Sequence, residues 1–246
     1  MPLGDGHGSR IYRKRQWGVV LYQNYFFDFD GTLYDTYGGM VSAFVLAFEN
    51  QGVKLDKNET YRLMRVESVR YCFALLKEKY PKLDEKKLHE DYHFFEKGNQ
   101  ELAEPFDFAG KVLETIQANG GQNFLLTHRD ESAKEILKRD GLLEYFKDFV
   151  TADDNFKRKP DPESLDYLLD KHQIDRKTAA MVGDRTLDVD AGHNAGIAGI
   201  LFDPDGLIKA DSCRPEQQIK TLKESIGEWK TRKLRPQFLR ADVFGA

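Results

Sequence analysis

The amino-acid sequence predicts an α/β fold, with a parallel β-sheet as its core and an inserted helical domain. Short apolar segments alternate along the chain with longer segments of helical periodicity, which is the pattern of a parallel sheet covered by helices on both faces. The chain has 246 residues, of which 40% are apolar and 12% aromatic. This is enough for a sizeable core together with a smaller insert.

Five short apolar segments have the length and composition of buried strands. They are Asn24–Phe29, Asn123–Thr127, Asp148–Ala152, Thr178–Val182 and Ile197–Phe202. Helical patterns accompany the last four of them, at Gly110–Asn119, Glu131–Lys138, Pro162–Lys171 and Asp188–Asn194. This order predicts a Rossmann-like core formed by residues 20–36 and 105–210.

Too much chain separates the first predicted strand from the second for a single crossover. In residues 37–104, apolar side chains recur at steps of three and four, for example at Leu63, Val66, Phe73 and Leu76. Such spacing gives each helix one apolar face. We therefore expect this segment to form three or four helices that make a separate helical cap.

The two ends of the chain extend beyond the predicted core. Residues 1–19 are rich in glycine and basic residues, which indicates an N-terminal extension that is disordered or derived from a tag. The apolar run Trp17–Tyr22 is short and lacks a small-residue cleavage site, so a cytoplasmic protein is expected rather than a secreted one. Within residues 211–246, apolar residues at helical spacing between Ile219 and Trp229 predict an amphipathic helix, followed by a basic tail.

The composition argues against several classes of partner. The net charge is −4, so the basic footprint of a nucleic-acid-binding protein is missing. The longest apolar stretch, Met40–Phe48, is too short to cross a bilayer. Cys72 and Cys213 form no CxxC motif, which favours free buried thiols and leaves a disulfide open. The oligomeric state is not indicated by the sequence.

Two carboxylates lie at the carboxyl end of the first predicted strand. Asp28 and Asp30 are two residues apart, a spacing that on a strand directs both side chains to the same side. In open α/β sheets this edge is where ligands bind. Gly31 then permits a tight turn and a close approach of the backbone to a phosphate. Taken alone, the pair could equally be a solvated strand end.

A hydroxyl and a lysine follow later strands. Thr127 ends the second predicted strand, where its hydroxyl and backbone N–H could bind a phosphate oxygen. His128 and Arg129, which follow it, could touch the same ligand or be surface residues. Lys159 is followed by Pro160 and precedes Pro162, two residues that restrict the backbone and would hold the lysine in place. The alternatives are a structural threonine and a solvated loop lysine.

A second pair of carboxylates follows the fourth predicted strand. Asp184 and Asp188 are four residues apart, which allows both to approach one cation. Hard oxygen ligands without a histidine or cysteine favour Mg²⁺ over zinc. The alternative for Asp188 is a helix cap.

The four clusters occur in the order DFDGTLYDT, LLTHR, KPDP and GDRTLDVDAG. In this order and composition the chain resembles the haloacid dehalogenase superfamily, in particular its phosphoglycolate-phosphatase-like branch, over about residues 24–204. The helical insert lies where members with a cap after the first motif carry theirs. The resemblance implies a phosphatase that uses Mg²⁺ to hydrolyse a small phosphomonoester.

The resemblance also implies a role for each motif residue. Asp28 would be the nucleophile that forms an aspartyl-phosphate. Asp30 would protonate the leaving oxygen and then activate water. Thr127, Lys159 and the backbone near Gly31 would hold the phosphoryl oxygens. Superfamily members that displace halide or cleave phosphonates lack an acid at the position of Asp30, so its presence favours phosphate esters.

The metal ligands implied by the resemblance are Asp28, Asp184 and the backbone carbonyl of Asp30, with Asp188 as a ligand or a support. Five basic side chains of the insert are candidates for contacts with the leaving group. They are Arg62, Arg65, Arg70, His89 and His93.

Two other functions remain open. A sugar phosphomutase shares the core but keeps the phosphoryl group between two half-reactions. A non-catalytic phosphate-binding or interaction module would be expected to have lost Asp28, Asp30 or Lys159, and none is lost.

Overall fold

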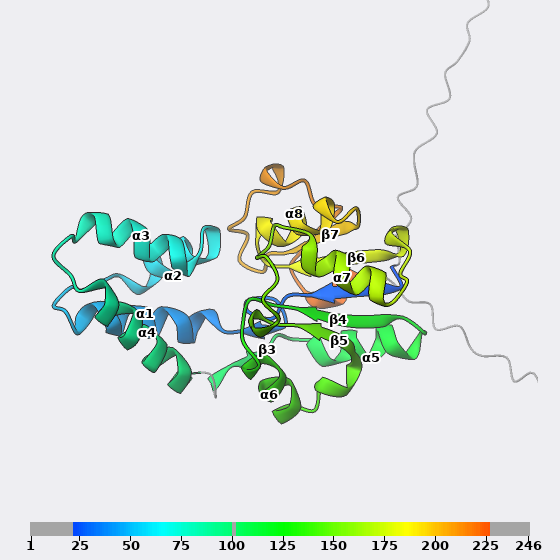
Figure 1. Ribbon diagram of the computed structural model, residues 1–246, viewed down its shortest axis with the longest axis horizontal. Coiled ribbons are helices and arrows are strands. Elements are labelled where there is room, and N and C mark those ends of the chain that lie inside the picture. The colour runs from blue at the N-terminus through cyan, green and yellow to red at the C-terminus, as the bar shows by residue number, and fades with distance from the viewer. Residues whose placement is uncertain (1–21, 100–101, 227–246) are drawn as a thin grey trace, which may run out of the picture.

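The core is a six-stranded sheet in which every pair of neighbours is parallel, in the order β5-β4-β1-β6-β7-β8. The computed structural model describes residues 22–99 and 102–226 (Figure 1). The strands are β1 (Asn24–Phe27), β4 (Gln122–Leu126), β5 (Phe146–Val150), β6 (Ala179–Gly183), β7 (Ala198–Phe202) and β8 (Gln217–Ile219). Strand β1 lies in the interior of the sheet and pairs with β4 and β6.

Helices cover both faces of the sheet, so the core has three layers (Figure 1). They are α5 (Ala109–Ala118), α6 (Ser132–Arg139), α7 (Glu163–Lys171) and α8 (Thr186–Asn194). Successive residues of β1 point to opposite faces. Phe27 packs with residues of α5 and α6, whereas Phe26 packs with residues of α7 and α8. Burial on both faces explains why the interior strands β1, β4, β6 and β7 are mostly apolar rather than alternating.

Four helices lie to one side of the sheet (Figure 1). In the sequence they come between two short strands that pair antiparallel, β2 (Tyr34–Asp35) and β3 (Glu104–Pro105). We refer to these four helices as the cap. They are α1 (Tyr37–Glu49), α2 (Lys57–Val66), α3 (Val69–Lys79) and α4 (Glu85–Asn99). Phe44, Phe73 and Tyr92 are buried in a separate apolar cluster of the cap. The side chains of Asp56 and Ser68 accept backbone N–H bonds and so define the starts of α2 and α3.

All five predicted strands are confirmed, although β5 begins and ends two residues earlier than expected. The predicted amphipathic helix from Ile219 is wrong in its described part. Ile219 ends the sixth strand β8, and a 3₁₀ segment, η6 (Leu222–Ile226), follows. The apolar side chains still pack against the core, since a strand end and a 3₁₀ turn can present the same spacing as a helix. Trp229, the basic tail and the N-terminal extension lie outside the described residues.

Cys72 and Cys213 are buried free thiols, in agreement with their spacing. Within residues 22–99 and 102–226, no helix is both long and apolar enough to span a bilayer.

Candidate active site

The motif residues meet at the carboxyl ends of the interior strands. Asp28 follows β1, Thr127 follows β4 and Asp184 follows β6. Because these strands are parallel neighbours, their carboxyl ends lie at one edge of the sheet. Lys159 reaches the same edge from the loop that precedes α7.

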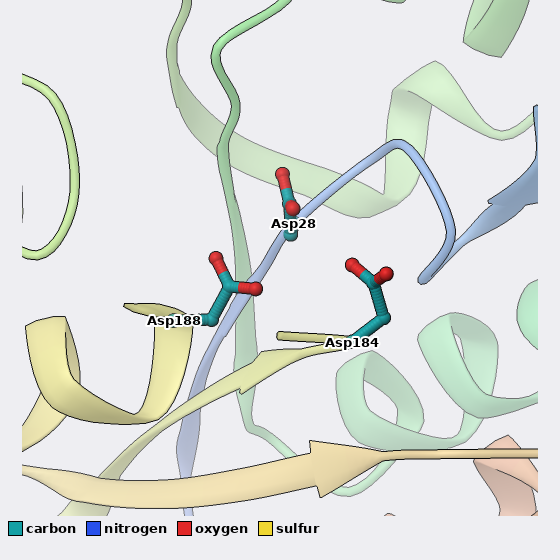
Figure 2. A group of neighbouring side chains, drawn as sticks. All are labelled: Asp28, Asp184 and Asp188. Atoms are coloured by element: carbon teal, nitrogen blue, oxygen red, sulfur yellow. The ribbon is translucent and has the colours of Figure 1, made fainter. Parts of the chain in front are cut away.

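Three buried carboxylates form the centre of the site. Asp28, Asp184 and Asp188 each offer an oxygen, and these oxygens lie within 4.8 Å of one another (Figure 2). The relative exposure of these residues is 2%, 0% and 0%. Gly183 allows this packing, because a Cβ at that position would lie 2.2 Å from the Cβ of Asp188.

Lys159 lies between two of these carboxylates. Its Nζ lies 3.0 Å from Asp28 Oδ1 and 2.6 Å from Asp188 Oδ1, and it donates a hydrogen bond of 3.1 Å to the carbonyl of Leu126. Burial opposes the charge of the ammonium group, but attraction to Asp188 and Asp28 outweighs it and raises the pKa of Lys159. The lysine therefore stays protonated between the two carboxylates.

Opposing electrostatic effects determine the pKa of Asp28. Burial and repulsion from Asp188 outweigh the attraction of Lys159 and raise the pKa of Asp28 to about 7. Within the described residues its Oδ2 is buried without a hydrogen-bond partner. Three converging carboxylates, one with an orphaned oxygen, fit the preference of a divalent cation for hard oxygen ligands.

Thr127 and His128 offer fewer donors to a phosphate than the sequence suggested. The backbone N–H of Thr127 donates to the carbonyl of Val150 at 3.0 Å, so the expected free N–H is wrong and only the hydroxyl remains as a donor. His128 Nε2 accepts the backbone N–H of Lys159 at 2.9 Å. Burial, followed by repulsion from Lys159 and Arg158, lowers the pKa of His128 to about 2. The imidazole is therefore neutral and could contact a ligand only as a neutral group.

Gly31 shapes the loop between the first motif and the cap. Its φ is +74°, and a Cβ there would lie 2.3 Å from the ring of Tyr37 and 2.6 Å from Asp184 Oδ2. The N–H of Gly31 donates to the carbonyl of Tyr34 at 2.8 Å. That N–H is engaged within the turn, so Gly31 contributes close packing rather than a free donor.

Asp30 is oriented by Arg129, which the sequence indicates only as a possible contact of the substrate. Arg129 Nε donates to both carboxylate oxygens of Asp30, at 3.0 and 3.2 Å, and Nη2 donates to Oδ1 at 2.7 Å. The same Nη2 donates to Glu96 Oε1 on cap helix α4 at 3.0 Å. Only 7% of the Arg129 side chain is exposed. The signal in the sequence was its position just after the second predicted strand.

The cap also reaches Asp184. Arg65 of α2 is buried and pairs with the carboxylate of Asp184, and its Nη1 donates to the Asp184 carbonyl at 3.2 Å. Tyr37 donates its hydroxyl to Asp184 Oδ2 at 2.9 Å. Arg65 Nη2 also lies 3.5 Å from Asp203 Oδ1, just after β7. The sequence reading missed Tyr37 and Asp203, although the rule that selects carboxylates at strand ends would have found Asp203.

The two histidine candidates of the cap contact other cap residues. The ring of His89 lies 4.1 Å from that of Phe73, and the ring of His93 lies 5.4 Å from that of Tyr92, both within the cap. Arg62 and Arg70 are exposed.

Comparisons with known proteins identify the family of the chain. The haloacid dehalogenase-like hydrolase family matches residues 25–208. The chain is 27% identical to the pyrophosphatase PpaX of Halalkalibacterium halodurans over 205 residues, which cover 75% of this chain and 91% of the relative. It is 31% identical to a phosphoglycolate phosphatase of Vibrio parahaemolyticus over 106 residues, 43% of this chain and 46% of the relative.

Similar solved structures are also those of hydrolases. A hydrolase from Streptococcus pneumoniae is 34% identical, with a TM-score of 0.57, over 74% of this chain and 92% of that one. A putative phosphatase from Clostridium difficile shares the fold with a TM-score of 0.70 and 22% identity, over 82% of this chain and 96% of that one. The chain therefore belongs to the haloacid dehalogenase-like hydrolase family.

Proposed function

We propose that this protein is a Mg²⁺-dependent phosphatase that hydrolyses a small phosphomonoester through an aspartyl-phosphate at Asp28. The observation that carries the proposal is the position of Asp28 between Lys159 Nζ, at 3.0 Å, and a cluster of further buried carboxylates. A nucleophile, a fixed cation and metal ligands in one place are the requirements of phosphoryl transfer.

In the first step an Asp28 oxygen attacks phosphorus, a new O–P bond forms and the ester O–P bond breaks. Asp30, in its protonated form, gives its proton to the departing oxygen. In the second step Asp30 takes a proton from water, whose oxygen attacks the aspartyl-phosphate, and inorganic phosphate leaves with Asp28 restored. Lys159 and the hydroxyl of Thr127 would hold the phosphoryl oxygens.

A Mg²⁺ ion would be held by Asp28, Asp184 and Asp188 together with the backbone carbonyl of Asp30. When bound, the ion supplies positive charge that offsets the repulsion between the Asp28 carboxylate and the phosphate dianion.

The names of the relatives support small phosphorylated substrates, since they include phosphoglycolate phosphatases and pyrophosphatases. A phosphomutase would use the same core residues. The two activities differ in their products, because a mutase returns the phosphoryl group to an isomeric sugar.

A panel of phosphomonoesters assayed with Mg²⁺ tests the proposal. We expect steady release of inorganic phosphate from at least one of them, and its loss when the metal is chelated. Release that continues unchanged without divalent metal would contradict the proposed metal dependence. Turnover that needs a bisphosphate primer and yields an isomer would identify a mutase instead.

Replacing Arg129 by glutamine should impair the protonation of the leaving group. The substitution removes the three donor contacts that fix Asp30. We expect kcat/KM to fall by about 100-fold for an alkyl phosphate, the lower range for general-acid catalysis. The value for p-nitrophenyl phosphate should change little, because nitrophenolate departs without a proton. Steady-state kinetics on the two substrates measures the difference.

The Glu96→Gln variant is the matched control, because it weakens the cap contact of Arg129 and leaves the pair with Asp30 in place. It should retain the activity on both substrates better than the Arg129 variant. Equal losses on alkyl and nitrophenyl phosphate in Arg129→Gln would show that Arg129 does not act through the acid.

A further inference from the structure

Arg65 belongs to cap helix α2, yet its guanidinium group is buried against the carboxyl edge of the core sheet. Only 1% of the residue is exposed. Each of its three guanidinium nitrogens lies near a core carboxylate. Nη1 pairs with Asp184, Nη2 lies 3.5 Å from Asp203 Oδ1, and Nε lies 3.7 Å from Asp205 Oδ2. The core therefore engages this side chain, which is directed at a proposed metal ligand rather than at solvent.

Asp203 anchors Arg65 on the core. It is 1% exposed, and its carboxylate accepts the backbone N–H groups of Leu207 and Ile208, each at 3.1 Å. Gln218 Nε2 donates a third hydrogen bond to it, also at 3.1 Å. All three donors belong to the core, so Asp203 is held in place without the cap. Arg65 is thus fixed by Asp203 on one side and contacts Asp184 on the other.

The cap contacts of the Asp184 carboxylate fall on one of its two oxygens. Oδ2 pairs with Arg65 and accepts the hydroxyl of Tyr37 at 2.9 Å. The backbone carbonyl of Asp184 also accepts a hydrogen bond from Arg65 Nη1, at 3.2 Å. Oδ1 accepts the hydroxyl of Thr32 at 3.3 Å, which is long for an O–H···O bond. Oδ1 is therefore the oxygen with the greater capacity to bind a cation.

Arg65 and Tyr37 also hold one another in place. The guanidinium carbon of Arg65 lies 5.1 Å from the centre of the Tyr37 ring, a cation–π contact. The Tyr37 ring meets the ring of Tyr61 edge to face, with 5.9 Å between the ring centres. Tyr61 in turn donates its hydroxyl to Asp205. These contacts restrict the rotamers of both side chains, so their donors are already directed at Asp184.

We propose that Arg65 and Tyr37 are positioning residues that orient the Asp184 carboxylate for a divalent cation, so that the metal site is complete only when the cap is docked. The inference rests on the proposed function and deepens its metal site. Groups that donate hydrogen bonds to metal ligands fix the orientation of those ligands. Because coupling between two binding events is reciprocal, the cation must favour docking of α2 as much as docking favours the cation.

Calorimetric titration with Mg²⁺ in the absence of substrate tests the orienting role. We expect Arg65→Gln to raise the Kd for Mg²⁺ by about 10- to 100-fold, the usual effect of losing a group that supports a metal ligand. Tyr37→Phe should raise the Kd toward the lower end of that range, and Arg65→Lys should recover part of the affinity. The matched controls are Lys57→Gln and Tyr71→Phe, at exposed positions of α2 and α3. Both should bind Mg²⁺ like the parent.

Hydrogen exchange gives a second readout, which a loss of stability alone would not reproduce. Mg²⁺ should slow the amide exchange of α2 in the parent and should have little effect on it in Arg65→Gln. If Arg65→Gln does not fold, Tyr37→Phe decides the result. That variant removes one hydroxyl and leaves the buried pair of Arg65 and Asp184 in place.

Either of two results would overturn this inference alone. Equal Mg²⁺ affinities of the parent, Arg65→Gln and Tyr37→Phe would show that neither residue orients Asp184. Tighter binding in Arg65→Gln, with faster exchange of α2 when Mg²⁺ is added to the parent, would show that Arg65 competes with the cation. A parent that binds no divalent cation would instead refute the metal site of the proposed function, and this inference with it.

Discussion

Replacement of Asp28 by asparagine is expected to lower the rate of phosphate release by about 10⁴- to 10⁶-fold, the range found when a catalytic nucleophile is removed. An amide cannot attack phosphorus as a carboxylate does. The variant should remain folded, because asparagine has nearly the same shape and Lys159 keeps its contact of 2.6 Å with Asp188. Phosphate release from the best substrate, measured with excess Mg²⁺, gives the result.

The control for this prediction is Asp211→Asn, a change of the same kind at an exposed position. It should have the activity of the parent. If Asp28→Asn hydrolyses the substrate as fast as the parent, the assignment of the nucleophile is wrong.

Replacement of Lys159 by methionine is expected to impair both catalysis and folding. The ammonium group lies between Asp28 and Asp188, and the residue is only 5% exposed. Loss of one buried partner leaves the carboxylates uncompensated, so the metal-free protein should lose about 3–5 kcal/mol of unfolding free energy. The rate should fall by about 100- to 1,000-fold, as for the loss of one transition-state donor.

Urea denaturation and steady-state kinetics measure these two effects. Lys171→Met is the matched control, because Lys171 lies 2.8 Å from Asp148 but its side chain is 45% exposed. Solvent screens such a pair, so little change in stability is expected. Mg²⁺ should restore part of the stability lost by Lys159→Met, since a cation would again neutralise the carboxylates. A Lys159 variant as stable and active as the parent would remove the lysine from the proposed site.

The sheet could be predicted because its interior strands are buried on both faces. In Asn123–Thr127, for example, three consecutive apolar residues are followed by a polar one, which marks the position of the strand and its carboxyl end. The prediction failed at β8, where Ile219 belongs to an edge strand of three residues. A strand of three residues is too short to show the alternation of apolar and polar residues that identifies a strand. Its pairing with β7 is seen only in the tertiary structure.

The site residues that could be predicted are those that directly follow a strand. Asp28, Thr127 and Asp184 follow this rule, and the parallel sheet brings them together. The contacts of Arg129 and Arg65 could not be read in the same way. Their partners lie 99 and 119 residues away in the chain, and an arginine on a helix or a loop is most often a solvated surface residue.

The sequence also does not show which backbone N–H groups are free to bind a ligand. The sequence shows that Thr127 ends a strand, but it does not show that the neighbouring strand already uses its N–H. It also contains no sign that the turn after Asp30 engages the N–H of Gly31. Hydrogen-bond partners of the backbone depend on register and loop shape, which appear only once the chain is folded.

The central claim is that a phosphoryl group passes through Asp28. Acid quenching of the enzyme during turnover, followed by proteolysis and mass spectrometry, tests it most directly. We expect one phosphoryl group on Asp28, absent from Asp30 and Asp35 of the same segment. Steady phosphate release with no phosphorylated enzyme, or with the label on a different residue, would contradict the mechanism.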